Sequence, residues 1–186
     1  MKWSLNELQQ YQDEPLSLNS TIDLNASLTE RFPDLILAVA PVNVTGYLSY
    51  EKGDVMVTAT VKTDLTLPST RSLTPVKFPT QFTFTEYYLE DESHIERYEN
   101  DETVIVLDDD RKIDFDEAVA ENIVLELPMR VLSKEEQQQG APLPTGSGWE
   151  VVSEEDYVAN GTKHDSVDPR LAKLKELLPD QDDNNN

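Results

Sequence analysis

Two stretches of alternating residues, joined by a proline-bounded loop, constrain this chain more than any other feature. From Val55 to Leu67, apolar residues share one parity of position, interrupted only by Thr63, while the other parity is mainly polar. The alternation returns from Val76 to Phe84, where Pro79 marks an edge, a bulge or a late start of pairing. A period of two predicts half-buried strands. We therefore expect these two strands, with residues 68–75 as their loop, to form the centre of a sheet.

The first forty residues divide into shorter elements. Ser4 and Glu7 have the spacing of a capping box, which predicts a short N-terminal helix lying on the sheet. Alternation predicts a strand over residues 16–24, and residues 26–32 suit one helical turn. The apolar run over residues 35–40 predicts a buried strand.

Later patterns complete the expected fold. Residues 42–50 alternate and are followed by a glycine-containing turn at 51–54, so we expect a hairpin. A helix near 114–127 has Asp114 as its N-cap, and a C-terminal helix near 168–178 has its own cap and proline. We therefore expect an α+β fold, with a mostly antiparallel sheet that curls towards a barrel and with flanking helices.

Composition divides the chain into four parts. We expect an α+β core domain over residues 1–132 and a flexible acidic loop, rich in glutamine, glycine and proline, over 133–166. The C-terminal helix occupies 167–179, and a disordered polar tail occupies 180–186. The 186 residues suffice for one modest hydrophobic core.

The charge of the chain restricts its partners. The formal net charge is -22, and the segment between positions 86 and 121 contains fifteen acidic residues but only three basic ones. A broad grip on nucleic acid requires clustered lysine and arginine, so a basic protein partner fits better. The acidic segment is either a solubility device or an RNA mimic that steers a basic protein towards the chain.

Catalytic, metal and cofactor chemistry have no support in the sequence. The chain has no cysteine, and His94 and His164 have no partner in a recognisable arrangement, so we expect both histidines at the surface. The acids of residues 108–116 lack the central glycine and distal glutamate of a calcium loop. We expect a protein that is not an enzyme and has no cofactor. Because no apolar run could span a bilayer and no secretory h-region is present, we expect it in the cytoplasm.

The expected C-terminal helix supplies most of the candidate binding residues. Asp168 can cap this helix, and Pro169 suits its first position. Arg170 opposes the helix dipole there, so it either pairs with a carboxylate of the chain or contacts a partner. Leu171 and Leu174 share a stripe that either docks on the chain's own sheet or enters a partner's groove.

Four segments together carry a family resemblance. They are MKWSLNEL at the N-terminus, the STRSL loop, RKIDFDEAVAENIVLELPMRVL, and above all VDPRLAKLKELL. With these segments the chain resembles the YceD/YlbN family of large ribosomal RNA subunit accumulation proteins. The resemblance implies a non-catalytic factor that supports large ribosomal subunit assembly and accumulation of 23S ribosomal RNA, through a basic ribosomal protein or ribosomal RNA. The alternative is an acidic chaperone or interaction module for basic proteins unrelated to ribosomes.

The chain departs from the resembled family at its cysteines. Many similar members carry Cys-x-x-Cys where residues 69–72 stand here, and a further cysteine cluster where residues 133–149 stand. No metal can therefore be carried over, and the loop is either held by other contacts or has lost its order. Arg71 is a further candidate for partner binding. Direct RNA binding would depend on Lys62, Arg71 and Lys77, which form the one plausible basic cluster.

Overall fold

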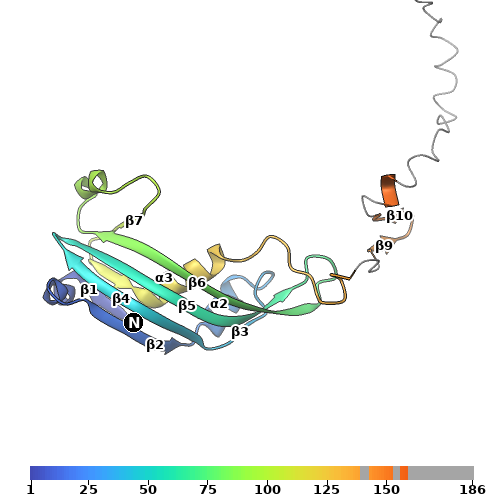
Figure 1. Ribbon diagram of the computed structural model, residues 1–186, viewed down its shortest axis with the longest axis horizontal. Helices are drawn as coiled ribbons and strands as arrows, with labels where there is room; N and C mark the ends of the chain where they lie inside the picture. The colour runs from blue at the N-terminus through green and yellow to red at the C-terminus, as the bar shows by residue number, and fades with distance from the viewer. Residues whose placement is uncertain (139–142, 153–155, 159–186) are drawn as a thin grey trace, which may run out of the picture. The chain divides into compact units, whose positions relative to one another are not determined.

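The computed structural model describes residues 1–138, 143–152 and 156–158 (Figure 1). The chain divides between residues 139 and 140 into two units, each of which is described by itself. The described part of the second unit contains a two-stranded hairpin of β9 (Thr145–Gly146) and β10 (Trp149–Glu150). The first unit contains the large sheet and its helices. The expected C-terminal helix near 168–178 lies outside the described residues.

The large sheet has six strands and two free edges. Its strands are β2 (Leu16–Ile22), β3 (Ala38–Val39), β4 (Val42–Glu51), β5 (Asp54–Pro68), β6 (Pro75–Leu89) and β7 (Thr103–Val106). The order is β2-β4-β5-β6-β7, with β3 paired to β5, and every pair except β6 with β7 is antiparallel. Closure into a barrel requires the first and last strands to pair. β2 and β7 do not pair, so the expectation of a barrel is wrong, while the mostly antiparallel α+β fold is confirmed.

The alternating stretches form the long central hairpin that their period predicts. β5 and β6 pair in one continuous register, from Val55 opposite Tyr88 to Pro68 opposite Pro75. Pro79 lies within β6 where no further strand pairs, which confirms the edge reading of this proline. The β4–β5 turn is also confirmed.

Two parts of the chain differ from the sequence prediction. The run over residues 35–40 forms only the two-residue β3, and Leu35 is 52% exposed, because alternate side chains of this short edge segment face solvent. β1 (Lys2–Ser4) pairs with β8 (Lys112–Asp114) in a separate small sheet. This pairing joins residues about a hundred positions apart, so local periodicity carried no sign of it.

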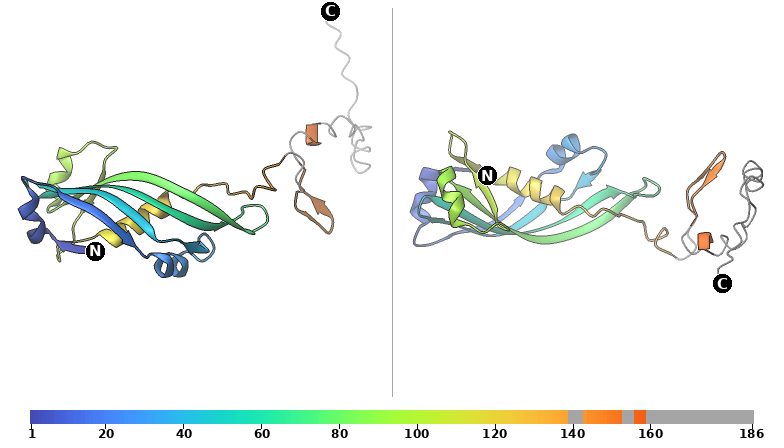
Figure 2. Two further views of the ribbon diagram at one scale, coloured as in Figure 1. Left: turned by 60° about the horizontal axis from the view of Figure 1, so that its bottom comes forward. Right: turned by 90° about the horizontal axis from the view of Figure 1, so that it is seen from above.

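Helices cover one face of the large sheet (Figure 2). α1 (Leu5–Leu8), which continues into the 3-10 helix η1 (Gln9–Tyr11), begins at the predicted capping box. α2 (Asn25–Arg31) is the predicted short helix, and α3 (Phe115–Leu125) starts at Asp114, whose carboxylate accepts the backbone N–H of Glu117.

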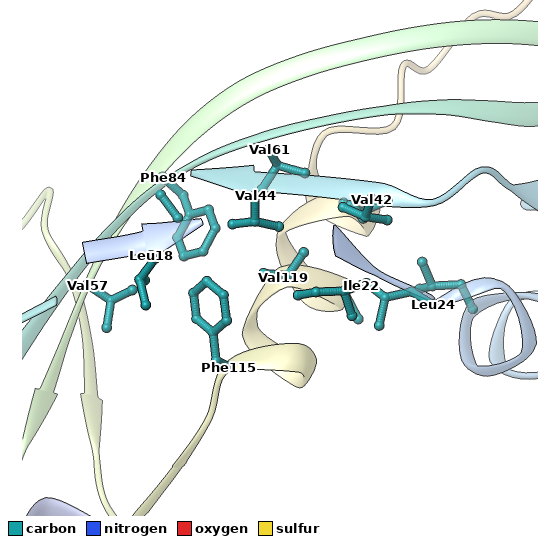
Figure 3. Close-up of a cluster of buried hydrophobic side chains, with 14 of the residues drawn as sticks. Leu18, Ile22, Leu24, Val42, Val44, Val57, Val61, Phe84, Phe115 and Val119 are labelled. Atoms are coloured by element: carbon teal, nitrogen blue, oxygen red, sulfur yellow. The ribbon is translucent and has the colours of Figure 1, made fainter. Parts of the chain in front are cut away.

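A single apolar core lies between the helices and the sheet. Phe115, Val119 and Ile123 of α3 are fully buried against valines, leucines and Phe84 of the sheet (Figure 3). Burial of this kind stabilises a fold by about 25 cal/mol for each Å² of apolar surface removed from water. The helices of the described residues leave the opposite face of the sheet uncovered.

Candidate functional site

The loop of the central hairpin is closed against the segment that follows α3. The backbone N–H and the Oγ1 hydroxyl of Thr70 both donate to the carbonyl of Val131, at 2.8 and 2.9 Å. Ser69 is fully buried, and its hydroxyl donates to Glu136 Oε2 at 2.7 Å. The loop is thus held by contacts other than those of a cysteine-bound metal, which answers the alternative that the sequence left open.

Glu136 is the centre of this contact, which we call the loop clasp (Ser69, Thr70, Ser72, Val131, Ser133 and Glu136). Its carboxylate accepts the backbone N–H of Ser133 at 2.7 Å in addition to the Ser69 hydroxyl. The hydroxyls of Ser72 and Ser69 and the N–H of Ser133 lower the pKa of Glu136 to about 2. Hydrogen bonds to the charged form of a carboxylate favour that form. The clasp therefore holds an anion with neutral donors.

Ser69 performs two tasks in the clasp. Besides donating to Glu136, its Oγ accepts the backbone N–H groups of Arg71 at 3.1 Å and Ser72 at 3.3 Å. These bonds fix the turn that follows Ser69, because short hydroxyl side chains can bond the backbone two and three residues on. Within the described residues, no group of three histidine, aspartate or glutamate side chains is placed to hold a metal ion.

Arg71 joins the clasp as well. Its Nη1 donates to the carbonyl of Glu136 at 3.3 Å, and the side chain is half-buried. Lys62 of β5 lies opposite Gln81 of β6, and Lys77 lies four residues before Gln81. The two lysines are therefore separated by about 13 Å along the strand direction. The structure therefore does not gather the three basic residues into one compact cluster. A partner-binding role for Arg71 remains a prediction.

The other candidate binding residues belong to the expected C-terminal helix. Asp168, Pro169, Arg170, Leu171 and Leu174 all lie outside the described residues. Their roles likewise remain predictions.

A buried carboxylate at the start of β5 was missed by sequence reasoning. Asp54 is 4% exposed, and its Oδ1 lies 2.6 Å from Nδ1 of His94. Arg97 and Tyr98 donate to its Oδ2 at 3.2 and 3.0 Å. Burial and the hydrogen bond to Asp54 raise the pKa of Tyr98 above its ordinary value.

The expectation that His94 is a surface residue without a partner is wrong. Its side chain is only 16% exposed and faces Asp54. His94, Arg97 and Tyr98 belong to the segment of η2 (Glu92–Arg97) and its end, and their spacing of three and four residues places them on one side of a helical turn. That spacing was the only sign in the sequence that the three side chains act together. The sequence did not show that Asp54 is their shared partner, because the fold alone brings it beside them.

The Asp54 cluster ties the β4–β5 turn to η2. A hollow of about 160 Å³ lies beside it, lined by Ser49, Glu51, Asp54, Met56, Tyr87 and Tyr98. In the described part of the chain, the hydrogen bond of the His94 ring is to Asp54, and no hydroxyl nucleophile is bonded to it. An activated nucleophile requires such a contact with its base.

Uncompensated acids gather around η2, β7 and the loop to β8, a region that we call the acidic end (Figure 1). Its exposed carboxylates without an ion-pair partner among the described residues are those of Asp91, Glu92, Glu96, Glu99, Asp101, Asp108 and Asp109. Other acids nearby are neutralised: Glu90 pairs with Arg111, and Glu117 pairs with Arg31 at 2.6 Å. The negative charge of this region is therefore concentrated at one end of the sheet.

The uncovered face of the sheet has the opposite character. In register across β2, β4, β5 and β6 stand three rows of partly or fully exposed residues. The rows are Ser17, Tyr47, Thr58 and Thr85; Asn19, Thr45, Thr60 and Thr83; and Thr21, Asn43, Lys62 and Gln81. We call this surface the open face. Its three rows contain no carboxylate, and the next row along the same face carries one, that of Asp64 opposite Pro79.

Comparison with known proteins supplies the family. A family model described as "Large ribosomal RNA subunit accumulation protein YceD" matches residues 57–178. The chain is 34% identical over 183 residues to "Uncharacterized protein YlbN" of Bacillus subtilis (strain 168), and the alignment covers 98% of this chain and 99% of that protein. No solved structure gives a significant match. Among the described residues no helix is long and apolar enough to cross a membrane. The family resemblance of the sequence is thus confirmed: the chain belongs to the YceD family.

Proposed function

We propose that this protein is a non-catalytic factor that supports large ribosomal subunit assembly and the accumulation of 23S ribosomal RNA by binding a basic large-subunit protein. The family description supports the link to ribosomal RNA. The acidic end supports the choice of partner, and it is the observation that carries the proposal. Seven exposed carboxylates there form no ion pair among the described residues.

Electrostatics explain how such a surface would act. Unpaired charges of one sign raise the association rate of an oppositely charged partner, and salt screens this attraction. A basic protein that binds RNA presents lysines and arginines that would otherwise contact phosphates. Contacts between these residues and the carboxylates of the acidic end would keep the basic protein soluble until RNA displaces the factor.

Direct binding of ribosomal RNA is the second candidate, and the open face favours it. Lys62 and Lys77 both project from the uncovered face of the sheet, on which the exposed Asp64 lies in register between them. Two lysines about 13 Å apart give only a weak grip on phosphates, so we rank this candidate second.

The test is a pull-down with the intact chain from lysate at low and moderate salt, with bound proteins and RNA identified. One variant changes Glu96, Glu99 and Asp101 to lysine. A matched variant changes Asp34, Glu126 and Glu135, which are exposed acids away from the acidic end, to lysine. Both variants change the net charge equally.

We expect wild-type capture of basic large-subunit proteins to fall steeply with salt. The acidic-end variant should lose at least about tenfold, while the matched variant should lose much less. Capture that is insensitive to salt, or equally weakened by both variants, would contradict the proposal. Capture of ribosomal RNA that depends on Lys62 and Lys77 would favour the second candidate.

A further inference from the structure

The two lateral edges of the large sheet are built differently (Figure 1). β7 covers residues Glu86–Leu89 of β6, and the uncovered remainder carries Lys77 and Pro79. β7 itself, the outermost strand at this edge, has only four residues. A very short edge strand, lysine and proline are all devices with which proteins block unwanted strand pairing. At the other edge, no strand of the described residues pairs with the outer side of β2, and β2 contains neither residue type. The edge of β2 is therefore the unprotected one.

The register identifies which backbone groups of β2 face outward. The N–H of Ala40 donates to the carbonyl of Asp64, so even-numbered residues of β5 present their backbone groups to the side of β3 and β4. In antiparallel sheets the direction of these groups alternates along each strand, and opposite residues share it. Applied through the β4–β5 and β2–β4 registers, this alternation leaves the N–H and C=O groups of Ser17, Asn19 and Thr21 facing away from the sheet.

These outward groups are accessible. Ser17, Asn19 and Thr21 are exposed, and no backbone hydrogen bond from elsewhere in the described residues reaches them. β2 pairs with β4 without a bulge from Leu16 to Ile22, and β2 has no charged residue. An unbroken, uncharged edge of this kind can accept an extended chain as a further strand.

Carboxylates stand at both ends of this neutral edge. Asp13 and Glu14 precede β2, Asp23 follows it, and all three are exposed. A second copy paired antiparallel about Asn19 would bring Asp23 of each copy beside the acids that precede β2 in the other. Such a pair of like charges is destabilising, and each copy already carries a net charge of -22. A strand with lysine or arginine near both ends would meet opposite charges instead.

We propose that the edge of β2 binds an extended segment of a basic protein as an additional strand of the sheet. Main-chain hydrogen bonds to Ser17, Asn19 and Thr21 hold the segment, and the acids at the two ends of β2 select a basic one. Alternate side chains of the segment extend the open face. The inference rests on the proposed function in that it takes the partner to be a basic protein, and it adds the place and mode of binding.

Proline substitutions test the edge in the full-length chain. Asn19→Pro removes an outward N–H that makes no bond within the sheet, so β2 keeps its bonds to β4. Gln81→Pro is the matched control, because Gln81 is exposed and its N–H faces outward on the uncovered edge of β6. Circular dichroism checks that both variants fold. The probe is a labelled synthetic peptide of alternating threonine and valine residues between two pairs of lysines, and a second peptide has glutamates in place of the lysines.

We expect the basic peptide to bind the wild type and to slow amide exchange at residues 17–21. Asn19→Pro should weaken binding by about tenfold or more, Gln81→Pro should leave it nearly unchanged, and the glutamate peptide should not bind. Equal binding by the wild type and Asn19→Pro would overturn the inference. So would self-association of the wild type that Asn19→Pro abolishes, because the occupant would then be a second copy. If both proline variants unfold, Asn19→Lys with Thr45→Lys as its control gives the same comparison, since Thr45 lies beside Asn19 on an interior strand.

The lysate pull-down separates this inference from the proposed function. Undiminished capture of basic large-subunit proteins by Asn19→Pro would support the proposed function and overturn the edge as its site. Peptide binding at β2 without capture of any large-subunit protein would support the edge and contradict the proposed function.

Discussion

The central hairpin has a hydrogen-bonded carboxylate at each end, but the two carboxylates have different kinds of partner. At the β4–β5 end, the buried Asp54 faces the ring of His94 and the cation of Arg97. At the loop end, Glu136 is held by the hydroxyls of Ser69 and Ser72 and by a backbone N–H. The comparison shows that the carboxylate at one end pairs with a cation, Arg97, whereas the carboxylate at the other end is held by neutral donors.

Removing Asp54 should have the largest effect. Asp54→Ala leaves His94, Arg97 and Tyr98 without their shared acceptor, and we expect the free energy of unfolding to fall by roughly 2–3 kcal/mol. Urea denaturation measures this change. The control is Asp64→Ala on the same strand, where the exposed carboxylate makes no ion pair within the described residues; it should change stability by less than about 0.5 kcal/mol. Equal effects of the two substitutions would contradict the role of the Asp54 cluster.

Neutralising Glu136 should loosen the loop end without unfolding the sheet. Glu136→Gln keeps the size of the side chain but loses the anion, and we expect amide exchange at Thr70 and Leu73 to rise by about tenfold. Hydrogen exchange followed by mass spectrometry or NMR reports this change. Glu135→Gln serves as the control, because Glu135 is exposed and outside the clasp. Unchanged exchange in Glu136→Gln would show that backbone bonds alone close the loop.

The same carboxylate predicts how the clasp responds to acid. The pKa of Glu136 lies at about 2 in the folded chain, below its ordinary value of 4.5. Its contribution to stability is therefore complete above the unfolded pKa and is lost as the pH falls through about 2. The amide shift of Ser133 measured against pH should follow this titration. A midpoint near the ordinary glutamate value would contradict the hydrogen bonding of the clasp.

The smallest effect is expected for Arg71. Arg71→Gln loses one bond to the carbonyl of Glu136, from a half-buried side chain, so stability should change by less than about 0.5 kcal/mol. Thermal unfolding and the lysate pull-down should be measured together. Reduced capture with an unchanged melting temperature would assign Arg71 to the partner, whereas reduced stability with unchanged capture would assign it to the clasp.

Much of the secondary structure was predictable because its causes are local. The alternation of β5 and β6, the capping box of Ser4 and Glu7, and the cap of α3 at Asp114 each depend on residues within a few positions of one another. The sequence could not show that the sheet stays open, because closure into a barrel depends on whether the two outermost strands pair. The buried strand expected at residues 35–40 failed because an apolar run alone does not show how much of it the sheet will cover.

Candidate sites followed the same division. The excess of acids between residues 86 and 121 and the absence of cysteine were visible in the sequence. The sequence could not show which acids remain unpaired, since the partners of Glu90 and Glu117 come from distant segments.

The amino-acid sequence by itself determined the long hairpin, the helix starts, the net charge of -22 and the family resemblance. Only the tertiary structure decided that Asp54 meets His94 across 40 positions, that Ser69 meets Glu136 across 67, and that β2 presents an unprotected edge. The physical reason is that periodicity and capping act between neighbours along the chain. Hydrogen bonds between distant residues and the exposure of a strand edge exist only after the sheet has assembled around its core.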